Sequence, residues 1–227
     1  MAAYFVRGVA GFGSGLIAIP LLVLMLPLSV AVPLVVLLDY VASASHGIRH
    51  RQAVRWQDIW PLLPFTLCGV AVALYLFKNV DAQLLGRALG VFVIVYALYT
   101  LMAGDVSSRV SRLWAVPAGG LGGLIGTLFG TGGPFYVLYL KHRGLAKTPF
   151  RATFATIFLL DGASRLGGYL LSGLYQVGML PLIAAALPLM AIGLYLGGNV
   201  HTAISQQTFQ RVISALLLVS GASLLIK

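Results

Sequence analysis

Several charged residues lie inside long apolar stretches of the sequence, and four of them, Arg7, Asp39, Asp161 and Arg165, are candidates for the site, whereas Arg87 and Arg211 lie nearer the ends of their runs. A charge at the centre of a bilayer costs about 3 kcal/mol or more unless it is paired or hydrated, so such residues are candidates for function. Arg7 or Arg165 would supply positive charge to an anion, and Asp39 or Asp161 could couple a proton or sodium ion. Two structural roles stay open beside these. Asp161 and Arg165 are four residues apart and can neutralise each other on one helix, and Arg7 can extend to the membrane interface.

Two glycine-rich segments, 11–15 and 130–134, interrupt apolar stretches at equivalent places. A helix broken at mid-membrane leaves free backbone N–H groups, which together with the helix dipole favour an anion. Glycine lets the backbone turn and approach a ligand closely, and Ser14 and Thr131 would add hydroxyl donors. Small residues also occur where membrane helices merely pack together. The candidate substrate-binding residues at the two breaks are Gly11, Phe12, Gly13, Ser14, Gly15, Gly130, Thr131, Gly132 and Gly133.

The sequence contains no recognisable catalytic set. There is no zinc-type histidine spacing, no Gly-x-Ser-x-Gly nucleophile elbow and no phosphate-binding Gly-Lys-Ser. The single cysteine, Cys68, lies in an apolar run, so neither a disulfide framework nor a thiolate metal site is expected. We therefore expect a protein that is not an enzyme and that uses no metal and no cofactor.

The composition indicates what kind of element positions these groups. Of 227 residues, 59% are hydrophobic and only 9% are charged, whereas a soluble domain is roughly one quarter charged. The net charge of +10 comes mainly from short loops beside apolar runs, which is how cytoplasmic loops orient a membrane protein, and nucleic acid is not an expected partner. A membrane span needs about 20 apolar residues, so the chain has room for roughly six to eight crossings.

Proline, glycine and charged residues separate the chain into apolar runs. Inside a bilayer such runs form helices, because a helix satisfies its own backbone hydrogen bonds. The expected fold is therefore an all-α polytopic membrane protein. The runs are 1–26, 28–47, 58–77, 82–103, 113–141, 149–171, 177–198 and 205–226.

An internal repeat divides these runs into two halves. The segment Leu74–Val80 reappears about 120 residues later as Leu194–Val200, and the two glycine breaks and the two aspartates recur in the same order. We expect a first transmembrane repeat over 1–108 and a second over 109–227, which together form one membrane domain. Fused halves of this kind are typical of secondary transporters.

Loop charges predict that the halves have opposite orientations. The loop after run 28–47 carries three arginines, but its counterpart 171–176 is uncharged, and the basic loop at 141–151 corresponds to the uncharged 26–29. Corresponding loops then lie on opposite sides of the membrane, as in an inverted repeat. Inversion requires an odd number of crossings, so each half would hold three transmembrane helices plus one glycine-broken re-entrant helical hairpin.

Two motifs resemble those of the TauE/SafE sulfite exporter family of membrane permeases. The first is Arg7–Leu22, with Ser14 at a place where glycine is usual, and the second is Gly119–Pro134. The resemblance spans nearly the whole chain. It implies a multi-pass protein of the inner membrane that exports a small anion such as sulfite or an organosulfonate.

The function expected from all this is secondary transport of a small anion by alternating access, coupled to an ion gradient. Two alternatives remain open at this stage. A passive anion channel could use the same broken helices, and a non-transporting scaffold subunit would need no binding site. The sequence does not indicate the oligomeric state.

Overall fold

The computed structural model describes residues 1–10, 13–47, 52–102, 111–199 and 206–226, and every regular element in these ranges is helical. The α-helices follow one another with short connections, and two 3-10 turns, η2 (Arg112–Trp114) and η3 (Val177–Met179), precede α7 and α10. The helices are α1 (Ala2–Ala10), α2 (Ser14–Val23), α3 (Leu28–Gly47), α4 (Trp56–Ile59), α5 (Leu63–Asn79), α6 (Ala82–Met102), α7 (Ala115–Phe129), α8 (Gly133–His142), α9 (Lys147–Leu171), α10 (Leu180–Asn199) and α11 (Gln206–Ile226).

These bounds agree closely with the apolar runs. Six runs each correspond to one long helix, and the two runs that contain the glycine-rich segments 11–15 and 130–134 are each broken into two shorter helices. Within the described residues, the segments Ala82–Tyr99 and Val177–Asn199 are long and apolar enough to cross a membrane by length and composition alone. Helix α9 has the length to cross but carries charged residues in its interior.

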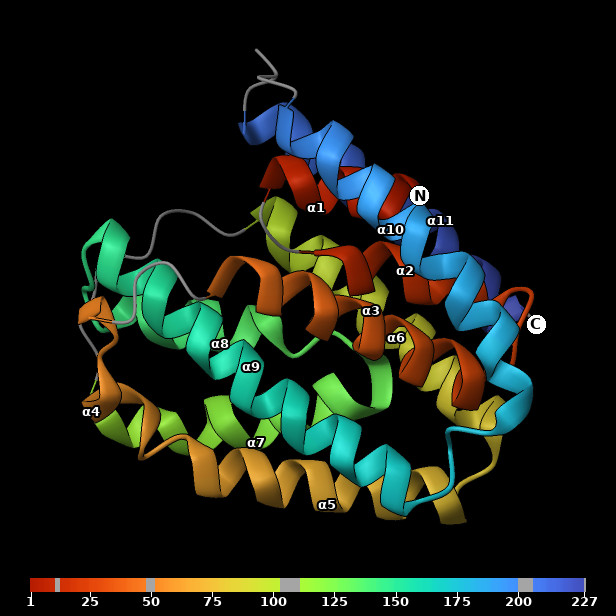
Figure 1. Ribbon diagram of the computed structural model, residues 1–227, viewed down its shortest axis with the longest axis horizontal. Coiled ribbons are helices and arrows are strands. Elements are labelled where there is room, and N and C mark those ends of the chain that lie inside the picture. Colours follow the sequence, from red (N-terminus) through yellow and green to blue (C-terminus); the bar gives the residue numbers. More distant parts are fainter. Residues whose placement is uncertain (11–12, 48–51, 103–110, 200–205, 227) are drawn as a thin grey trace.

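The two breaks produce helical hairpins, α1–α2 and α7–α8. Their helices contain 9 to 15 residues, which at 1.5 Å per residue is roughly 14 to 22 Å and less than a hydrocarbon core of about 30 Å. Gly13 and Gly130 have φ angles of +95° and +63°, a region that glycine adopts without the steric cost that a Cβ brings. In Figure 1 the hairpins extend toward each other from opposite ends of the long axis, and their broken ends come close at the centre.

Each hairpin packs against a long helix through glycine contacts. Helix α5 lies along α7, and α10 lies along α1. A Cβ at Gly69 on α5 would stand 2.7 Å from the backbone nitrogen of Leu124, and one at Gly8 on α1 would stand 2.8 Å from the Cα of Gly197. The absence of side chains lets these backbones approach closely, as is common where membrane helices touch.

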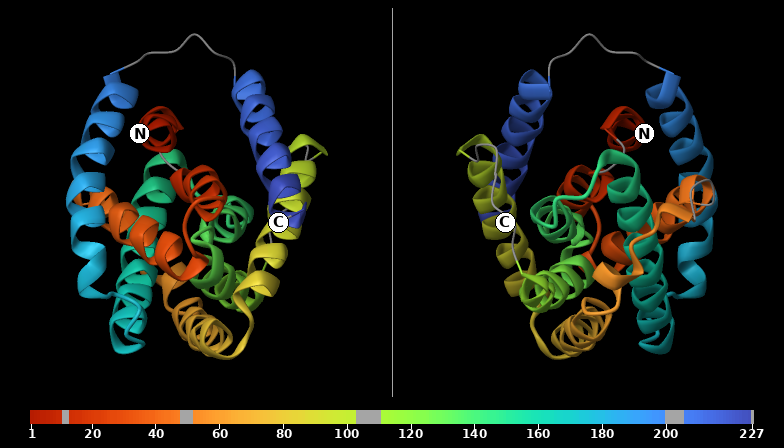
Figure 2. Two further views of the ribbon diagram at one scale, coloured as in Figure 1. Left: turned by 90° about the vertical axis from the view of Figure 1, so that its right-hand side faces the viewer. Right: turned by 90° about the vertical axis from the view of Figure 1, so that its left-hand side faces the viewer.

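Figure 2 shows the hairpins enclosed, with α10 on one side and α6 with α11 on the other. Helix α3 crosses α9 between them, so these two helices carry Asp39, Asp161 and Arg165 to the middle of the bundle. The main apolar core joins side chains of α2, α3 and α6.

The distribution of charged and apolar side chains is the reverse of that in a soluble protein. Arg7 and Asp39 are each 8% exposed, Arg165 is 3% exposed and Asp161 is 1% exposed. Outward-facing positions of the long helices are instead apolar. A bundle with apolar residues outside and ion pairs inside is suited to lipid surroundings. Exposed apolar side chains on α5, α6 and α10 include Leu67, Tyr75, Val95, Leu189 and Tyr195.

The loops at the two ends of the long axis differ in charge. Residues 52–55, 112–114 and 143–146 lie together at the left end in Figure 1, and the uncharged 24–27 and 172–176 lie at the right end. The basic loops therefore gather on one face of the bundle.

Candidate functional site

The first buried ion pair joins the half-helix α1 to the long helix α3. The Nη1 atom of Arg7 lies 2.7 Å from Oδ1 of Asp39 and donates to the hydroxyl of Ser14 at 3.0 Å. Ser14 in turn donates to Oδ1 of Asp39 at 2.7 Å. The Nη2 atom of Arg7 donates to the hydroxyl of Ser43 at 2.7 Å and to the backbone carbonyl of Asp39 at 3.3 Å. The pair is thus hydrogen-bonded on several sides, which a buried charge pair needs to offset its desolvation.

The second ion pair lies within α9. The Nε atom of Arg165 donates to Oδ1 of Asp161 at 3.0 Å, and its Nη2 forms an ion pair with Oδ2. The same Nη2 donates to the backbone carbonyl of Gly122 on α7 at 3.3 Å. A Cβ at Gly126 would collide with this guanidinium, and one at Gly132 would come within 2.5 Å of its Nη2. Glycines on both sides of the second break therefore leave the space that the guanidinium of Arg165 fills.

The two arginines approach their aspartates from different helices. Arg7 lies seven residues before Ser14, where α2 begins, and Gly126 lies seven residues before Gly133, where α8 begins. Arg165 lies four residues after Asp161, as Ser43 lies four after Asp39, and Ser43 is what Arg7 contacts. In the first ion pair the hairpin supplies the guanidinium, and in the second the long helix supplies it into the space beside a glycine.

The two sets of residues meet at one small cavity. It has a volume of ≈10 Å³, which is about the space of one water molecule. A Cβ at Gly15 would stand 3.6 Å from Oδ2 of Asp39 and would collide with the carbonyl of Gly130, so the first turn of α2 contacts the second hairpin's break. The centre is therefore closed in this conformation. The cavity is lined by Val36, Asp39, Tyr40, Gly130, Phe158, Gly162 and Arg165.

The structure places most of the predicted site residues at this centre. Thr131 is 3% exposed, and its hydroxyl has no hydrogen-bond partner in the described part of the chain. Gly133 instead packs against Phe158, 3.2 Å from where its Cβ would be. No atom lies within 4 Å of the Cβ position of Gly13. The predicted ligands Gly11 and Phe12 lie outside the described residues.

Sequence reasoning missed two features of the charged network. The contact of Arg7 with Asp39 joins residues 32 apart in the chain, and helical spacing cannot indicate such a pair. A further buried aspartate, Asp58, is 0% exposed and contacts arginines from three segments. Its position at the start of the run 58–77 could have drawn attention, because an acidic residue among basic loops is unusual here.

The charged groups at this centre have the chemistry to bind an anion. Two guanidinium groups and two carboxylates neutralise each other, and the guanidinium groups are the donors best suited to an oxyanion. An anion that contacts either guanidinium therefore competes with an aspartate. Among the described residues, no group of three or more His, Cys, Asp or Glu side chains is placed to hold a metal ion.

An apolar helical bundle with broken half-helices and internal ion pairs defines an integral membrane protein with a candidate anion site. Comparison with known proteins places it more closely: residues 1–224 match the family described as Sulfite exporter TauE/SafE. The chain belongs to this family, whose members are membrane transporters.

Two curated relatives support this assignment. The chain is 30% identical over 195 residues to a protein of Comamonas testosteroni named Probable inner membrane transporter protein TsaS, covering 84% of this chain and 81% of the relative. It is 24% identical over 232 residues to the Probable sulfite/organosulfonate exporter TauE of Cupriavidus necator, covering 99% of this chain and 90% of the relative. No solved structure matches the chain.

Proposed function

We propose that this protein is a secondary transporter of the inner membrane that exports a small sulfur oxyanion, such as sulfite or an organosulfonate. The observation that carries the proposal is the closed centre, where Asp39 and Arg165 from the two halves line a single cavity beside the break at Gly130. The names of the relatives support the substrate class and the location. The transported group would bind between the guanidinium groups and the backbone of the broken helices.

The proposal includes two inverted halves, 1–108 and 109–227. If the halves are equivalent, α5 corresponds to α10 and α7 corresponds to α1. The packing of α5 on α7 then has its counterpart in the packing of α10 on α1, and both helix pairs are in contact. The last residues of α5 and α10 also make the same kind of hydrogen bond. The side-chain amide of Asn79 donates to the carbonyl of Tyr75 at 2.8 Å, and that of Asn199 donates to the carbonyl of Tyr195 at 3.0 Å. Such pairing supports alternating access by movement of one half against the other.

Competition for the guanidinium groups provides the coupling. An incoming oxyanion displaces the carboxylate of Asp39 from Arg7, or that of Asp161 from Arg165. A carboxylate that stays buried without its partner is costly as an anion, so it takes up a proton. Binding of anion and proton are then favourably linked, and by thermodynamic reciprocity each raises the affinity for the other.

The test is a flux assay with the purified chain in proteoliposomes. Sulfite and a small organosulfonate are loaded inside, and their efflux is followed at several concentrations and pH gradients. We expect saturable efflux that responds to the pH gradient. Thr131→Ala should weaken it, because that hydroxyl is buried at the centre with no partner among the described residues. A matched control is Gly198→Ala, since no atom lies within 4 Å of that Cβ position.

The other two functional classes give different results in the same assay. Flux that rises linearly with concentration and ignores the pH gradient identifies a passive channel. A non-transporting subunit shows no flux above empty liposomes, and this result refutes the proposal if the protein is folded and inserted. Protein content and melting behaviour of each preparation establish that condition.

A further inference from the structure

A second set of charged residues surrounds Asp58 on the face where the basic loops gather. The Nε atom of Arg143 donates to Oδ1 of Asp58 at 2.9 Å. The Nε atoms of Arg55 and Arg112 lie 3.9 Å from its two carboxylate oxygens, beyond hydrogen-bond range but close enough for charge attraction. These residues come from the segment before α5, the turn before α7 and the turn between α8 and α9. One carboxylate thus holds three arginines together and leaves positive charge in excess.

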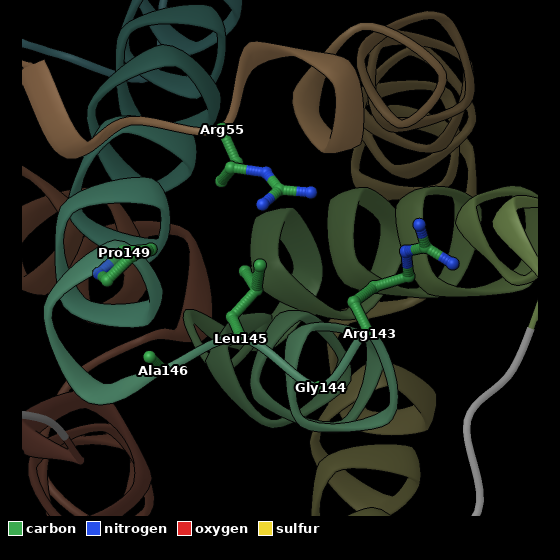
Figure 3. A pocket seen from close by; sticks show the side chains of 6 residues that line it. All are labelled: Arg55, Arg143, Gly144, Leu145, Ala146 and Pro149. Atoms are coloured by element: carbon green, nitrogen blue, oxygen red, sulfur yellow. The ribbon is translucent and has the colours of Figure 1, made fainter.

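A cavity of ≈380 Å³ lies beside this set. Arg55 and Arg143 line one part of it, and Leu145, Ala146 and Pro149 line the rest together with Gly144. Figure 3 shows the guanidinium of Arg55 from one segment and that of Arg143 from another, with the side chain of Leu145 below that of Arg55. The cavity is therefore cationic on one side and apolar on the other.

The first turn of α9 adds to the positive character of this cavity. Ala146 and Pro149 belong to the N-terminal end of a 25-residue helix whose first turn contains no acidic residue. The helix N-terminus carries a partial positive charge and favours an anion. Arg55 is also tied to this helix, because its backbone N–H donates to the hydroxyl of Thr153 at 3.0 Å.

We infer that this cavity is a second anion site, separate from the centre, that binds the oxyanion end of an organic sulfonate or phosphate. Guanidinium groups recognise oxyanions through paired hydrogen bonds, and the side formed by Leu145 and Pro149 suits an attached alkyl group. A bare inorganic ion would leave the apolar side and most of the volume unused. The inference concerns binding alone and stands whether or not the protein transports.

The chain offers a local reporter for this site. Its three tryptophans, Trp56, Trp60 and Trp114, occur next to Asp58 and Arg112 in the sequence, and all are exposed. Intrinsic tryptophan fluorescence of the full-length protein therefore reports on this face. The experiment titrates the protein in detergent with butanesulfonate and, separately, with inorganic sulfate. We expect a saturable change with butanesulfonate at concentrations at least tenfold lower than with sulfate.

Variants then test whether the fluorescence change comes from binding in this cavity. Arg55→Gln should raise the half-saturating concentration at least tenfold, because a charge-assisted hydrogen bond is lost, and Arg55→Lys should have a smaller effect because it keeps the charge. Leu145→Asp, which removes neither an arginine nor Asp58, should abolish binding because it places a negative charge inside the cavity. Arg87→Gln is the matched control, since this exposed arginine lies on α6.

A second arm identifies the source of the oxyanion. Short-chain phosphatidylglycerol is titrated in place of butanesulfonate, with short-chain phosphatidylcholine as its control. A change that saturates with phosphatidylglycerol and is weakened by Arg55→Gln supports the site and names a lipid headgroup as its ligand. The inference is refuted if no ligand gives a saturable change, or if Arg55→Gln and Leu145→Asp titrate like the parent protein.

Discussion

The sharpest test of the charged centre moves the guanidinium that contacts Asp161 from α9 to α7. Arg165→Ser removes the partner of Asp161, whose side chain is 1% exposed. Breaking a buried ion pair in this way costs about 3–5 kcal/mol, because the remaining charge has no compensation. At about 2–4 °C per kcal/mol for a protein of this size, the melting temperature should fall by roughly 6–20 °C. We expect flux to be lost as well.

The second change introduces an arginine at Gly126. In the parent protein this position has no room, since a Cβ there would already collide with the guanidinium of Arg165. Gly126→Arg alone should therefore destabilise by about 1–3 kcal/mol from overpacking, with repulsion between like charges in addition. In the Arg165→Ser background the same substitution places a guanidinium beside Asp161, as Arg7 stands beside Asp39. The double variant should recover about 2 kcal/mol, roughly half of the loss from breaking the pair.

The assay is thermal unfolding in detergent, followed by tryptophan fluorescence, with flux measured in parallel. The reciprocal pair, Arg7→Gly with Ser43→Arg, moves the guanidinium of the first half onto the long helix and serves as the matched experiment. The reasoning is refuted if Gly126→Arg is as destabilising in the Arg165→Ser background as in the parent. The reasoning requires that Gly126→Arg lowers the melting temperature in the parent and raises it in the Arg165→Ser background.

Three further predictions concern helix packing, coupling and topology. Gly123→Ala should destabilise by about 1–3 kcal/mol, because its Cβ would meet the backbone of α5, and Gly120→Ala, with no atom near its Cβ, should melt like the parent. Asp39→Asn should remove part of the dependence of efflux on the pH gradient while some flux remains, and a pH dependence identical to the parent would exclude this residue from coupling. In a background freed of the natural cysteine, cysteines at Ala53 and Gln176 should react with a membrane-impermeant maleimide from opposite sides, and labelling from one side would contradict the inverted topology.

Much of the helical architecture was predictable from local sequence. The run 28–47 coincides with α3, and 205–226 differs from α11 by one residue at its start. The breaks were predicted from their glycines, which lower the stability of a helix, but glycine alone does not fix their position, because the cluster at 119–123 lies inside the continuous helix α7. These signals are local, so a single sequence contains them.

The arrangement of charges within the centre was only partly predictable. The spacing of Asp161 and Arg165 indicates a pair within one helix turn, and the structure contains it. The partner of Asp39 depends on how α1 lies against α3, which no periodicity reveals. The arginines around Asp58 come from three segments and meet only in the folded chain.

The exchange of arginines between helices bears on what the centre requires. On the two-repeat proposal, an alignment of the halves sets Arg7 against Gly126 and Arg165 against Ser43, so the arginines appear unmatched in sequence. In space both guanidinium groups lie beside an aspartate at a glycine break. Moving an arginine to another helix without making room for it beside the aspartate leaves a buried charge uncompensated. On that proposal, the feature common to both halves is the neutral guanidinium–carboxylate pair at the break, which an entering anion would open.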